Sequence, residues 1–309
     1  MDRPTWPTPW PPSRRCAAQA RRNSTPSPAP TPPESSAGSS RLRVARLLEA
    51  HGLRPNTDLG QHFLLDENLA DLAVREGLVG PDDVVLEIGA GVGVLTRALA
   101  AAAATVHAVE LDTRLEPALT DALDGIDNVH VIWADAMDVE LEALDPPPTR
   151  MVANLPYDIA TPIMLESIAR APQITRWCVM VQREIAERWT ASRGSKAYSA
   201  ASVQMALTVT PTFRRSVGRE VFMPRPRVDS TLLGLERLAA PLPSGLRTLI
   251  RAAFAHRRKT LATGLGMTGA DRDAVRLALE RLGRDPASRA DALAPEDFVA
   301  LYGELGWPS

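Results

Sequence analysis

Three glycines, Gly89, Gly91 and Gly93, stand at every second position directly after the apolar run of residues 84–88. A short run of β-branched and apolar residues predicts a buried parallel strand, and the glycines predict a tight turn before a helix that resumes at Val94. Such a turn lets the backbone approach a ligand where a Cβ atom would block it. We interpret the turn as a candidate cofactor site; the alternative is a turn that is only structural.

Two acidic residues follow at the ends of predicted strands. The spacing G-x-G-x-G differs from the G-x-G-x-x-G that seats a dinucleotide pyrophosphate, which makes NAD the weaker choice. Glu110 lies 21 residues after Gly89, where a carboxylate can accept both hydroxyls of a ribose, and Asp135 can accept an adenine amino group. Each alone is more often a helix cap. Together they describe an adenosine site without a phosphate grip, which fits S-adenosylmethionine, and the local acidic excess suits its sulfonium charge.

Asn154-Leu-Pro-Tyr157 ends the predicted strand 150–154. The N6 amine of adenine is a poor nucleophile because its lone pair is delocalised into the ring, so a transferase must orient it. Asn154 Oδ1 and the Leu155 carbonyl can accept hydrogen bonds from the amine, Pro156 fixes the turn, and Tyr157 can stack on a flipped base. Methyl transfer then depends on proximity and orientation, without a protein general base. The alternative is an ordinary Asn-x-Pro turn before a helix.

Two basic motifs come later in the chain. In Phe222-Met-Pro-Arg-Pro-Arg-Val228 the prolines stiffen a loop that can hold Phe222 against a target base, while Arg225 and Arg227 reach phosphate. In Phe254-Ala-His-Arg-Arg-Lys-Thr260 we expect a helix with Phe254 facing the core. The residues expected to face outward and bind phosphate are Arg257, Arg258 and Lys259. The alternative is that they form a solvated helix face.

The elements that must position these residues alternate along the chain. We predict strands at 83–88, 105–110, 128–133, 150–154 and 175–182, and helices at 42–50, 67–76, 94–103, 112–123, 161–170 and from 183 to about 190. Alternation of this kind predicts an α/β fold, a doubly wound parallel sheet with helices on both faces, which collects ligands at the carboxyl ends of its strands. Two further strands are expected at 203–213 and 228–236, and a wholly helical pattern follows from Ser244.

Composition divides the chain into three parts. Residues 1–40 hold 10 of the 27 prolines, five arginines and two acids, which predicts a disordered segment. An Arg-rich, acid-poor start also fits a transit peptide, but the proline density forbids the long amphipathic helix of such a peptide, which favours a tail or an over-extended start codon. The other predicted parts are a catalytic domain at 41–240 and a small helical RNA-binding domain at 241–309. We see no apolar run of 18 residues, no cysteine pair within a domain and no histidine spacing for a metal, so we expect no membrane span, no metal and a reducing compartment, the cytoplasm. We also expect a monomer.

The net charge of −2 conceals a strong asymmetry. Residues 61–160 contain 4 basic and 19 acidic residues, a net of −15, whereas residues 171–260 contain 16 basic and 5 acidic residues, a net of +11. The basic segment interleaves arginines with aromatic residues, a mixture typical of surfaces that bind phosphates and unstacked bases. We therefore favour a nucleic acid partner over two surfaces that are merely solvated.

These motifs together resemble the ribosomal small-subunit RNA adenine dimethyltransferase A family over about residues 41–305. The resemblance rests on residues 59–64, 87–91, 110–112, 135–136, 154–157, 222–230 and 254–260, in the right order. It implies a class I methyltransferase with a Rossmann-like sheet, using S-adenosylmethionine to convert two adjacent adenines near the 3′ end of small-subunit (16S) rRNA, free or in a pre-small-subunit particle, to N6,N6-dimethyladenine. The cofactor residues that it implies are His62, Leu64, Gly89, Gly91, Glu110, Asp135, Ala136 and Asn154.

This chain departs from the family pattern at three positions where the family often has Asn: His62, Asp158 and Thr263. Two other functions also remain open. One is the macrolide-resistance group of large-subunit (23S) rRNA adenine methyltransferases, against which the Arg-Arg-Lys-Thr run argues. The other is an RNA-binding assembly or transcription factor on the same fold without chemistry, against which the complete set of cofactor motifs argues.

Overall fold

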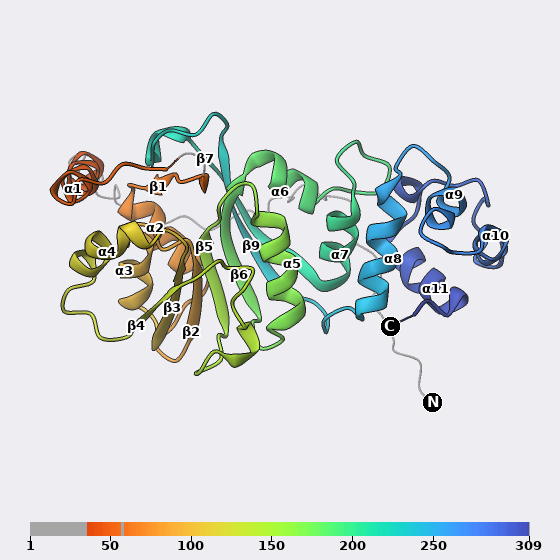
Figure 1. Ribbon diagram of the computed structural model, residues 1–309, viewed down its shortest axis with the longest axis horizontal. Helices are drawn as coiled ribbons and strands as arrows, with labels where there is room; N and C mark the ends of the chain where they lie inside the picture. The colour runs from red at the N-terminus through yellow and green to blue at the C-terminus, as the bar shows by residue number, and fades with distance from the viewer. Residues whose placement is uncertain (1–35, 57–58, 309) are drawn as a thin grey trace, which may run out of the picture. The chain divides into compact units, whose positions relative to one another are not determined.

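A mixed seven-stranded sheet forms the centre of the fold (Figure 1). The computed structural model describes residues 36–56 and 59–308. In the sheet order β4-β3-β2-β5-β6-β9-β7, the first five strands run parallel and the last two pair antiparallel. The strands are β2 (Val84–Ile88), β3 (Thr105–Glu110), β4 (Val129–Trp133), β5 (Arg150–Asn154), β6 (Arg176–Gln182), β7 (Val209–Val217) and β9 (Ser230–Arg237).

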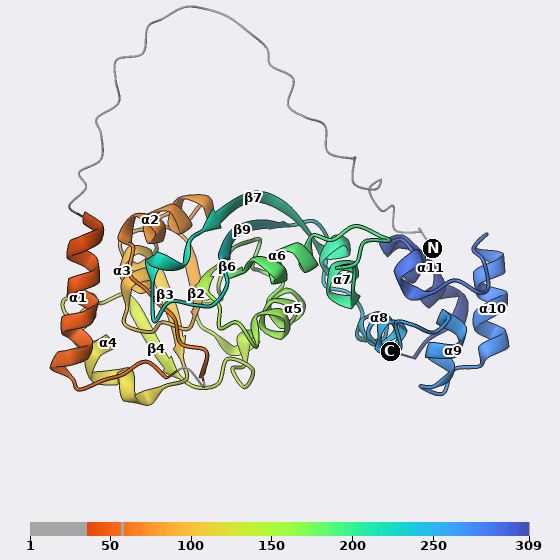
Figure 2. The same cartoon turned by 90° about the horizontal axis from the view of Figure 1, so that it is seen from above.

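Helices cover both faces of this sheet, as Figure 2 shows and as the sequence predicted. The helices of one face are α2 (Glu67–Glu76), α3 (Val94–Ala100) and α4 (Glu116–Ala122), and those of the other are α5 (Ala160–Arg170) and α6 (Arg183–Trp189). Strand β2 shows the cause. Val85 packs in the hydrophobic core between the sheet and α2, α3 and α4 (the first core), whereas Leu86 and Ile88 pack in the core between the sheet and α5 and α6 (the second core). All five residues of β2 are buried, as expected for a strand covered on both sides.

Helix α1 (Ser36–Ala50) precedes the sheet. Its last nine residues match the predicted helix 42–50, but the helix begins earlier, so the last five residues of the expected tail, 36–40, are helical. Residues 1–35, for which disorder was predicted, lie outside the described residues. The next helix, α2, has the predicted bounds and is capped by Asp66, whose side chain accepts a hydrogen bond from the Leu69 amide.

The strand predicted at 203–213 is wrong in its first half. Residues 200–208 form helix α7 (Ala200–Thr208), and β7 begins only at Val209. Val203 and Leu207 pack into the C-terminal core while Met205 packs into the sheet core. Because this helix is buried on both sides, it has no charged residue and no single apolar face, so its helical period is hidden in the sequence.

The C-terminal helices gather at one end of the view in Figure 2, and their side chains form a third hydrophobic core. They are α8 (Ser244–Ala255), α9 (Leu261–Gly266), α10 (Arg272–Arg281) and α11 (Pro295–Leu305). Tyr198 and the α7 residues Val203 and Leu207 belong to the same core. The helical core therefore recruits residues that precede the predicted boundary at 240–241. No helix in the described part of the chain is long and apolar enough to cross a membrane.

A two-stranded antiparallel pair, β1 (Phe63–Leu64) with β8 (Phe222–Met223), was not predicted. Leu64 pairs with Phe222 and Phe63 pairs with Met223. The pair brings two motifs that are 158 residues apart in the chain, those at 59–64 and 222–230, to one place. Four short 3-10 helices complete the described elements: η2 (Thr113–Leu115), η3 (Leu141–Ala143), η4 (Arg219–Val221) and η5 (Ala290–Ala292).

Candidate active site

A cavity of about 270 Å³ lies at the carboxyl ends of β2, β3, β4 and β5. Its walls contain every residue that the sequence assigned to the cofactor: His62, Leu64, Gly89, Gly91, Glu110, Asp135, Ala136 and Asn154. Leu155, Pro156 and Tyr157 line the same cavity. The structure therefore brings the glycine turn, the two strand-end acids and the Asn154–Tyr157 motif together at one edge of the parallel strands, where open α/β sheets bind ligands.

The glycine turn needs glycine at each of its three positions. Gly89, Gly91 and Gly93 have φ values of 81°, 58° and 79°, in the left-handed region that side chains disfavour. A Cβ atom on Gly91 would stand 3.0 Å from the ring of Phe63, and one on Gly93 would stand 3.1 Å from Leu119 Cδ1. Glycine is therefore required at all three positions by the backbone conformation, and at Gly91 and Gly93 also by packing. The Gly91 amide faces the end of β3.

Glu110 is held at that end of β3 by backbone donors. The Gly91 amide donates to Oε2 at 2.8 Å, and the Asp112 amide donates to Oε1 at 2.9 Å. Burial raises the pKa of this carboxyl group, and the two amide hydrogen bonds oppose the rise. Each carboxylate oxygen keeps a further lone pair for a ligand hydroxyl.

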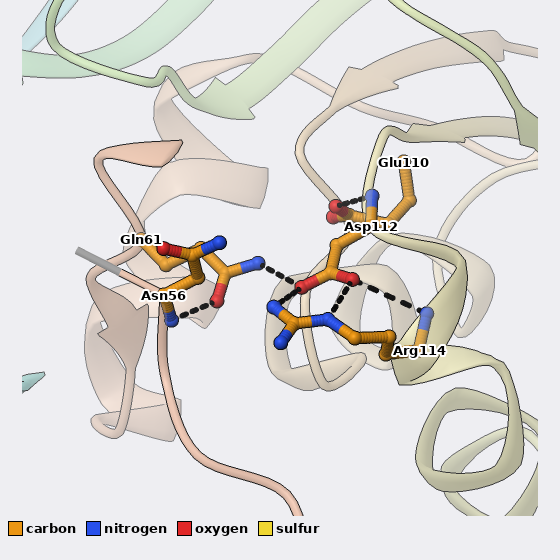
Figure 3. A network of polar contacts seen from close by, with 5 residues as sticks. All are labelled: Asn56, Gln61, Glu110, Asp112 and Arg114. Carbon is orange, nitrogen blue, oxygen red and sulfur yellow. Dashed lines mark hydrogen bonds and ion pairs between the residues drawn. The ribbon is translucent and has the colours of Figure 1, made fainter. Parts of the chain in front are cut away.

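Asp112 ties the segment before β1 to the end of β3 (Figure 3). Its carboxylate accepts two hydrogen bonds from the Arg114 guanidinium, at 2.7 and 2.6 Å, and one from Gln61 Nε2 at 2.8 Å. The hydrogen bonds from Arg114 are the main reason that the pKa of Asp112 is lowered. Gln61 Oε1 in turn accepts the Asn56 amide at 2.7 Å, so the cavity wall at residues 59–61 is fixed by an ionised group.

The Asn154 amide is oriented by a hydrogen bond from its Nδ2 to the His62 carbonyl oxygen, 3.0 Å long. This assignment leaves Oδ1 as the acceptor that lines the cavity together with Leu155. A Cβ atom on Gly89 would be 3.5 Å from the Asn154 carbonyl oxygen, which shows how closely the two motifs approach.

The imidazole of His62 contacts the 222–230 loop and the Tyr157 ring. Its Nδ1 lies 2.7 Å from the Pro224 carbonyl oxygen, and its ring lies 5.2 Å from that of Tyr157 at an interplanar angle of 32°. The Tyr157 hydroxyl is 2.8 Å from Ser230 Oγ, and burial raises its pKa. His62 thus joins the segment around β1 to the 222–230 loop and to Tyr157, contacts that Asn at this position would not make in the same way.

Phe222 is not where the sequence reasoning expected it. Its side chain is 1% exposed, packs in the first core of the sheet, and is absent from the cavity lining. The ring is buried because β8 pairs with β1 and turns it inward. The structure therefore places the Phe222 ring behind the wall of the site, and its contact with a target base stays a prediction.

The basic residues lie outside the cavity, and one expectation about them is wrong. Helix α8 ends at Ala255, so Arg257, Arg258 and Lys259 lie in a turn rather than on a helix. Arg257 is engaged, with its guanidinium donating to the Ser195 carbonyl and 3.8 Å from Asp291. Of the five residues assigned to RNA, the other four are exposed and have no ion pair to a described residue: Arg225, Arg227, Arg258 and Lys259.

Two lining acids, Glu87 and Asp158, were not assigned to the site from the sequence. An acid inside the apolar strand of residues 84–88 was the available signal for Glu87. With Glu110 and Asp135 they make four acidic groups on the cavity wall, where no Lys or Arg stands among the described residues. The described part of the chain also contains no cluster of three or more His, Cys, Asp or Glu residues able to hold a metal ion.

The sequence of this chain matches a known protein family over most of its length. The sequence model of the family described as "Ribosomal RNA adenine dimethylase" matches residues 52–305. The chain belongs to that family. The curated protein "Ribosomal RNA small subunit methyltransferase A" of Rubrobacter xylanophilus is 46% identical over 254 residues, 82% of this chain and 95% of the relative, and the protein of the same name from Thermobifida fusca is 40% identical over 84% and 93%.

Two solved structures share the fold. A dimethyladenosine transferase from Plasmodium falciparum has a TM-score of 0.67 at 26% identity, covering 80% of this chain and 99% of that one. The 23S rRNA methyltransferase ErmE has a TM-score of 0.57 at 29% identity, covering 79% and 99%. The predicted class I methyltransferase fold, a Rossmann-like α/β sheet with a C-terminal helical region, is confirmed, with two antiparallel strands added at one edge.

Proposed function

We propose that this member of the ribosomal RNA adenine dimethylase family transfers methyl groups from S-adenosylmethionine to N6 of two adjacent adenines near the 3′ end of small-subunit rRNA, giving N6,N6-dimethyladenine. The observation that carries the proposal is the position of Asn154–Tyr157 on the wall of the cavity that also holds the glycine turn and Glu110. One cavity can therefore hold an adenosine-containing methyl donor and the amine that attacks it.

The cavity residues fit S-adenosylmethionine. Four acids and no basic side chain among the described lining residues suit a cation that lacks phosphates. Glu110 accepts the ribose hydroxyls, and Asp135, whose Oδ1 already accepts the Met137 amide at 2.8 Å, accepts the adenine amino group with its other oxygen. When bound, the cofactor supplies an electrophilic methyl group.

The chain's own residues orient the acceptor amine. Asn154 Oδ1, fixed by the Nδ2 bond to His62, and the Leu155 carbonyl accept the two N6 hydrogens and turn the nitrogen toward the methyl group. Tyr157 stacks on the base; it also lines a neighbouring hollow whose walls include Arg188 and Arg251. Because orientation and proximity provide most of the rate, no protein base is needed, and the proton leaves to water.

RNA binding is assigned to the exposed cations of the 222–230 loop and of the turn after α8: Arg225, Arg227, Arg258 and Lys259. We infer a catalytic part at 41–240 and a helical RNA-binding part at 241–309, acting as a monomer in the cytoplasm on small-subunit rRNA or a pre-small-subunit particle. The +11 charge of residues 171–260 supports a partner rich in phosphate.

The experiment is methyl transfer to small-subunit particles and to large-subunit RNA, both prepared from cells that lack these modifications. Primer extension maps the product, since an adenine with two N6 methyl groups cannot pair and stops the polymerase. We expect adjacent stops near the 3′ end of the small-subunit RNA, and none with folded Asn154→Ala protein. Similarity to ErmE makes large-subunit methylation the second candidate, and a stop there would favour it. RNA binding without methylation of either RNA would favour a non-catalytic assembly factor.

A further inference from the structure

Glu87 is a buried acid that the function proposed above does not use. It lies in β2, is 1% exposed and lines the cofactor cavity, two positions before the first glycine of the turn. Its Oε2 atom has no hydrogen-bond partner among the described residues, and the polar side chain that acts on it is that of Thr96, a fully buried residue on α3. Buried polar atoms in native proteins are nearly always paired, so an unpaired one on a cavity wall points to a missing ligand.

No cation among the residues that the structure describes compensates this carboxyl group. The charge that acts on it is that of Glu110, at the end of the neighbouring strand β3. The remaining charged or titratable residues of α2, α3, β3 and β5 near this face are at least partly exposed or, in the case of the histidine, directed to the opposite face of the sheet: Glu67, Asp71, Arg75, Glu76, Arg97, His107 and Arg150. Arg150, at the far end of β5, pairs with Asp83. The Arg97 guanidinium donates to the Ala122 carbonyl.

Burial therefore controls the ionisation of Glu87. It raises the pKa to about 8, the neighbouring Thr96 hydroxyl opposes this rise, and the charge of Glu110 adds to it. Near neutral pH the carboxyl group of the free protein is mostly protonated, and it is poised to ionise if a positive charge enters the cavity.

The methyl donor and its product differ by one charge. S-adenosylmethionine carries a sulfonium group besides its amino-acid zwitterion, whereas the product after transfer has a neutral thioether. Because the Glu87 side chain is buried and the described cavity wall has no Lys or Arg, the extra positive charge of the sulfonium stabilises a carboxylate there and the thioether does not.

We propose that Glu87 is a specificity residue that reads the charge of the cofactor, an inference that rests on the function proposed above. Its carboxyl group releases a proton to solvent when the sulfonium form binds, and it takes a proton back from solvent once the methyl group has left. The sulfonium form is then held by an ion pair that the product cannot make, so the product is released more easily. Two methyl groups on each of two adenines require four transfers, and each is followed by this exchange.

The direct test is calorimetric titration of the full-length protein with S-adenosylmethionine and, separately, with S-adenosylhomocysteine, in two buffers of different ionisation enthalpy at about pH 7. The ligand amino group also titrates at roughly pH 7.7 to 8.0, so the quantity of interest is the difference between wild type and Glu87→Gln. We expect wild type to release close to one more proton than Glu87→Gln with the sulfonium ligand, and equal numbers with the thioether.

The pH dependence of affinity gives a second readout. With one linked proton and a pKa of about 8, the wild-type preference for the sulfonium ligand over the thioether rises by up to about 25-fold between roughly pH 6.5 and 8.5, relative to Glu87→Gln. Thr96→Val keeps the shape but removes the hydroxyl that lowers the pKa, so it moves the midpoint of this rise to higher pH.

The outcomes separate this proposal from the proposed function. Wild-type protein that binds neither ligand overturns both. Tight binding of the sulfonium ligand with the same proton release as the thioether overturns only the role of Glu87, as does a pH profile that neither variant changes. If Glu87→Gln does not fold, the midpoint shift in Thr96→Val decides: a shift to higher pH supports the proposal and an unchanged midpoint refutes it.

Discussion

Replacing Glu87 by Gln should change how the stability of the ligand-free protein depends on pH. The unfolded chain ionises this carboxyl group near its ordinary value of 4.5, while the folded protein holds the proton up to about pH 8. Between these values the folded state binds one more proton than the unfolded state. The free energy of unfolding therefore falls as pH rises from 4.5 to about 8, and the contribution is fully present only below 4.5.

The magnitude follows from the width of that window. Each pH unit with one extra bound proton changes the free energy by about 1.4 kcal/mol, so raising the pH from roughly 5.5 to 8.5 should cost wild type about 3 kcal/mol through Glu87 alone. The Gln amide resembles the protonated acid and does not titrate. The variant should match wild type within about 1 kcal/mol at the lower pH and be about 3 kcal/mol more stable at the higher one.

Urea unfolding at both pH values measures the difference in the free energy of unfolding between wild type and Glu87→Gln. The titration of other groups contributes equally to both proteins and cancels in this difference. Thr96→Val is the matched control: it removes a neighbouring hydroxyl without removing the titrating group, so it should keep or steepen the wild-type dependence. If Glu87→Gln lost stability with pH as steeply as wild type, Glu87 would be ionised in the folded state and the reasoning from burial would fail.

Three further predictions concern the rest of the site. Glu110→Ala should weaken S-adenosylmethionine binding by about 1.5 to 3 kcal/mol through lost hydrogen bonds to a charged acceptor, whereas Asn154→Ala should lower the methylation rate far more than the affinity; calorimetry with single-turnover kinetics decides, and equal affinity losses with the rate spared in Asn154→Ala would contradict the role of the amide. Replacing Arg258 and Lys259 with Gln should make the slope of log K against log salt for a small-subunit RNA fragment shallower by about 2, measured by filter binding, with unchanged cofactor affinity; an unchanged slope would make them solvated surface residues. His62→Asn should lower the free energy of unfolding by about 1 kcal/mol, because a side-chain hydrogen bond is lost; its cofactor affinity should stay the same, since the backbone carbonyl that binds the Asn154 amide remains, and a large loss of affinity would show a direct side-chain contact.

Local pattern was sufficient for the parallel part of the sheet. Strands 105–110 and 150–154 and helix 67–76 have the predicted bounds, because short apolar runs and an Asp cap are local signals. The pair β1 and β8 could not be predicted in this way: two-residue strands carry no periodicity, and their pairing depends on chain segments far apart. The same pairing buries Phe222, so the burial of its side chain could not be predicted from local pattern either.

Residues 200–208 illustrate a different limit. The segment is rich in Ala, Val, Met and Leu, and it was assigned to a strand because an apolar run buried on both sides shows no period. The one local sign of a helix start was Ser199, whose amide donates to Ser202 Oγ at 3.0 Å. Serine pairs of this kind occur in many loops, so the sign was too weak to outweigh the apolar run.

The acidic excess of residues 61–160 favoured a cationic cofactor, and the structure shows which of these acidic residues lie at the cavity. Of the 19 acidic residues between 61 and 160, only four line the cavity: Glu87, Glu110, Asp135 and Asp158. Charges on the surface beyond a Debye length of about 8 to 10 Å are screened by salt and contribute little to the potential inside the cavity. The preference for a cation must therefore come from these four groups, and most strongly from the buried ones, where the surrounding protein screens least. The net charge of the segment agrees with the cavity, but its effect on the ligand depends on which acids are buried there and which of them already have donors.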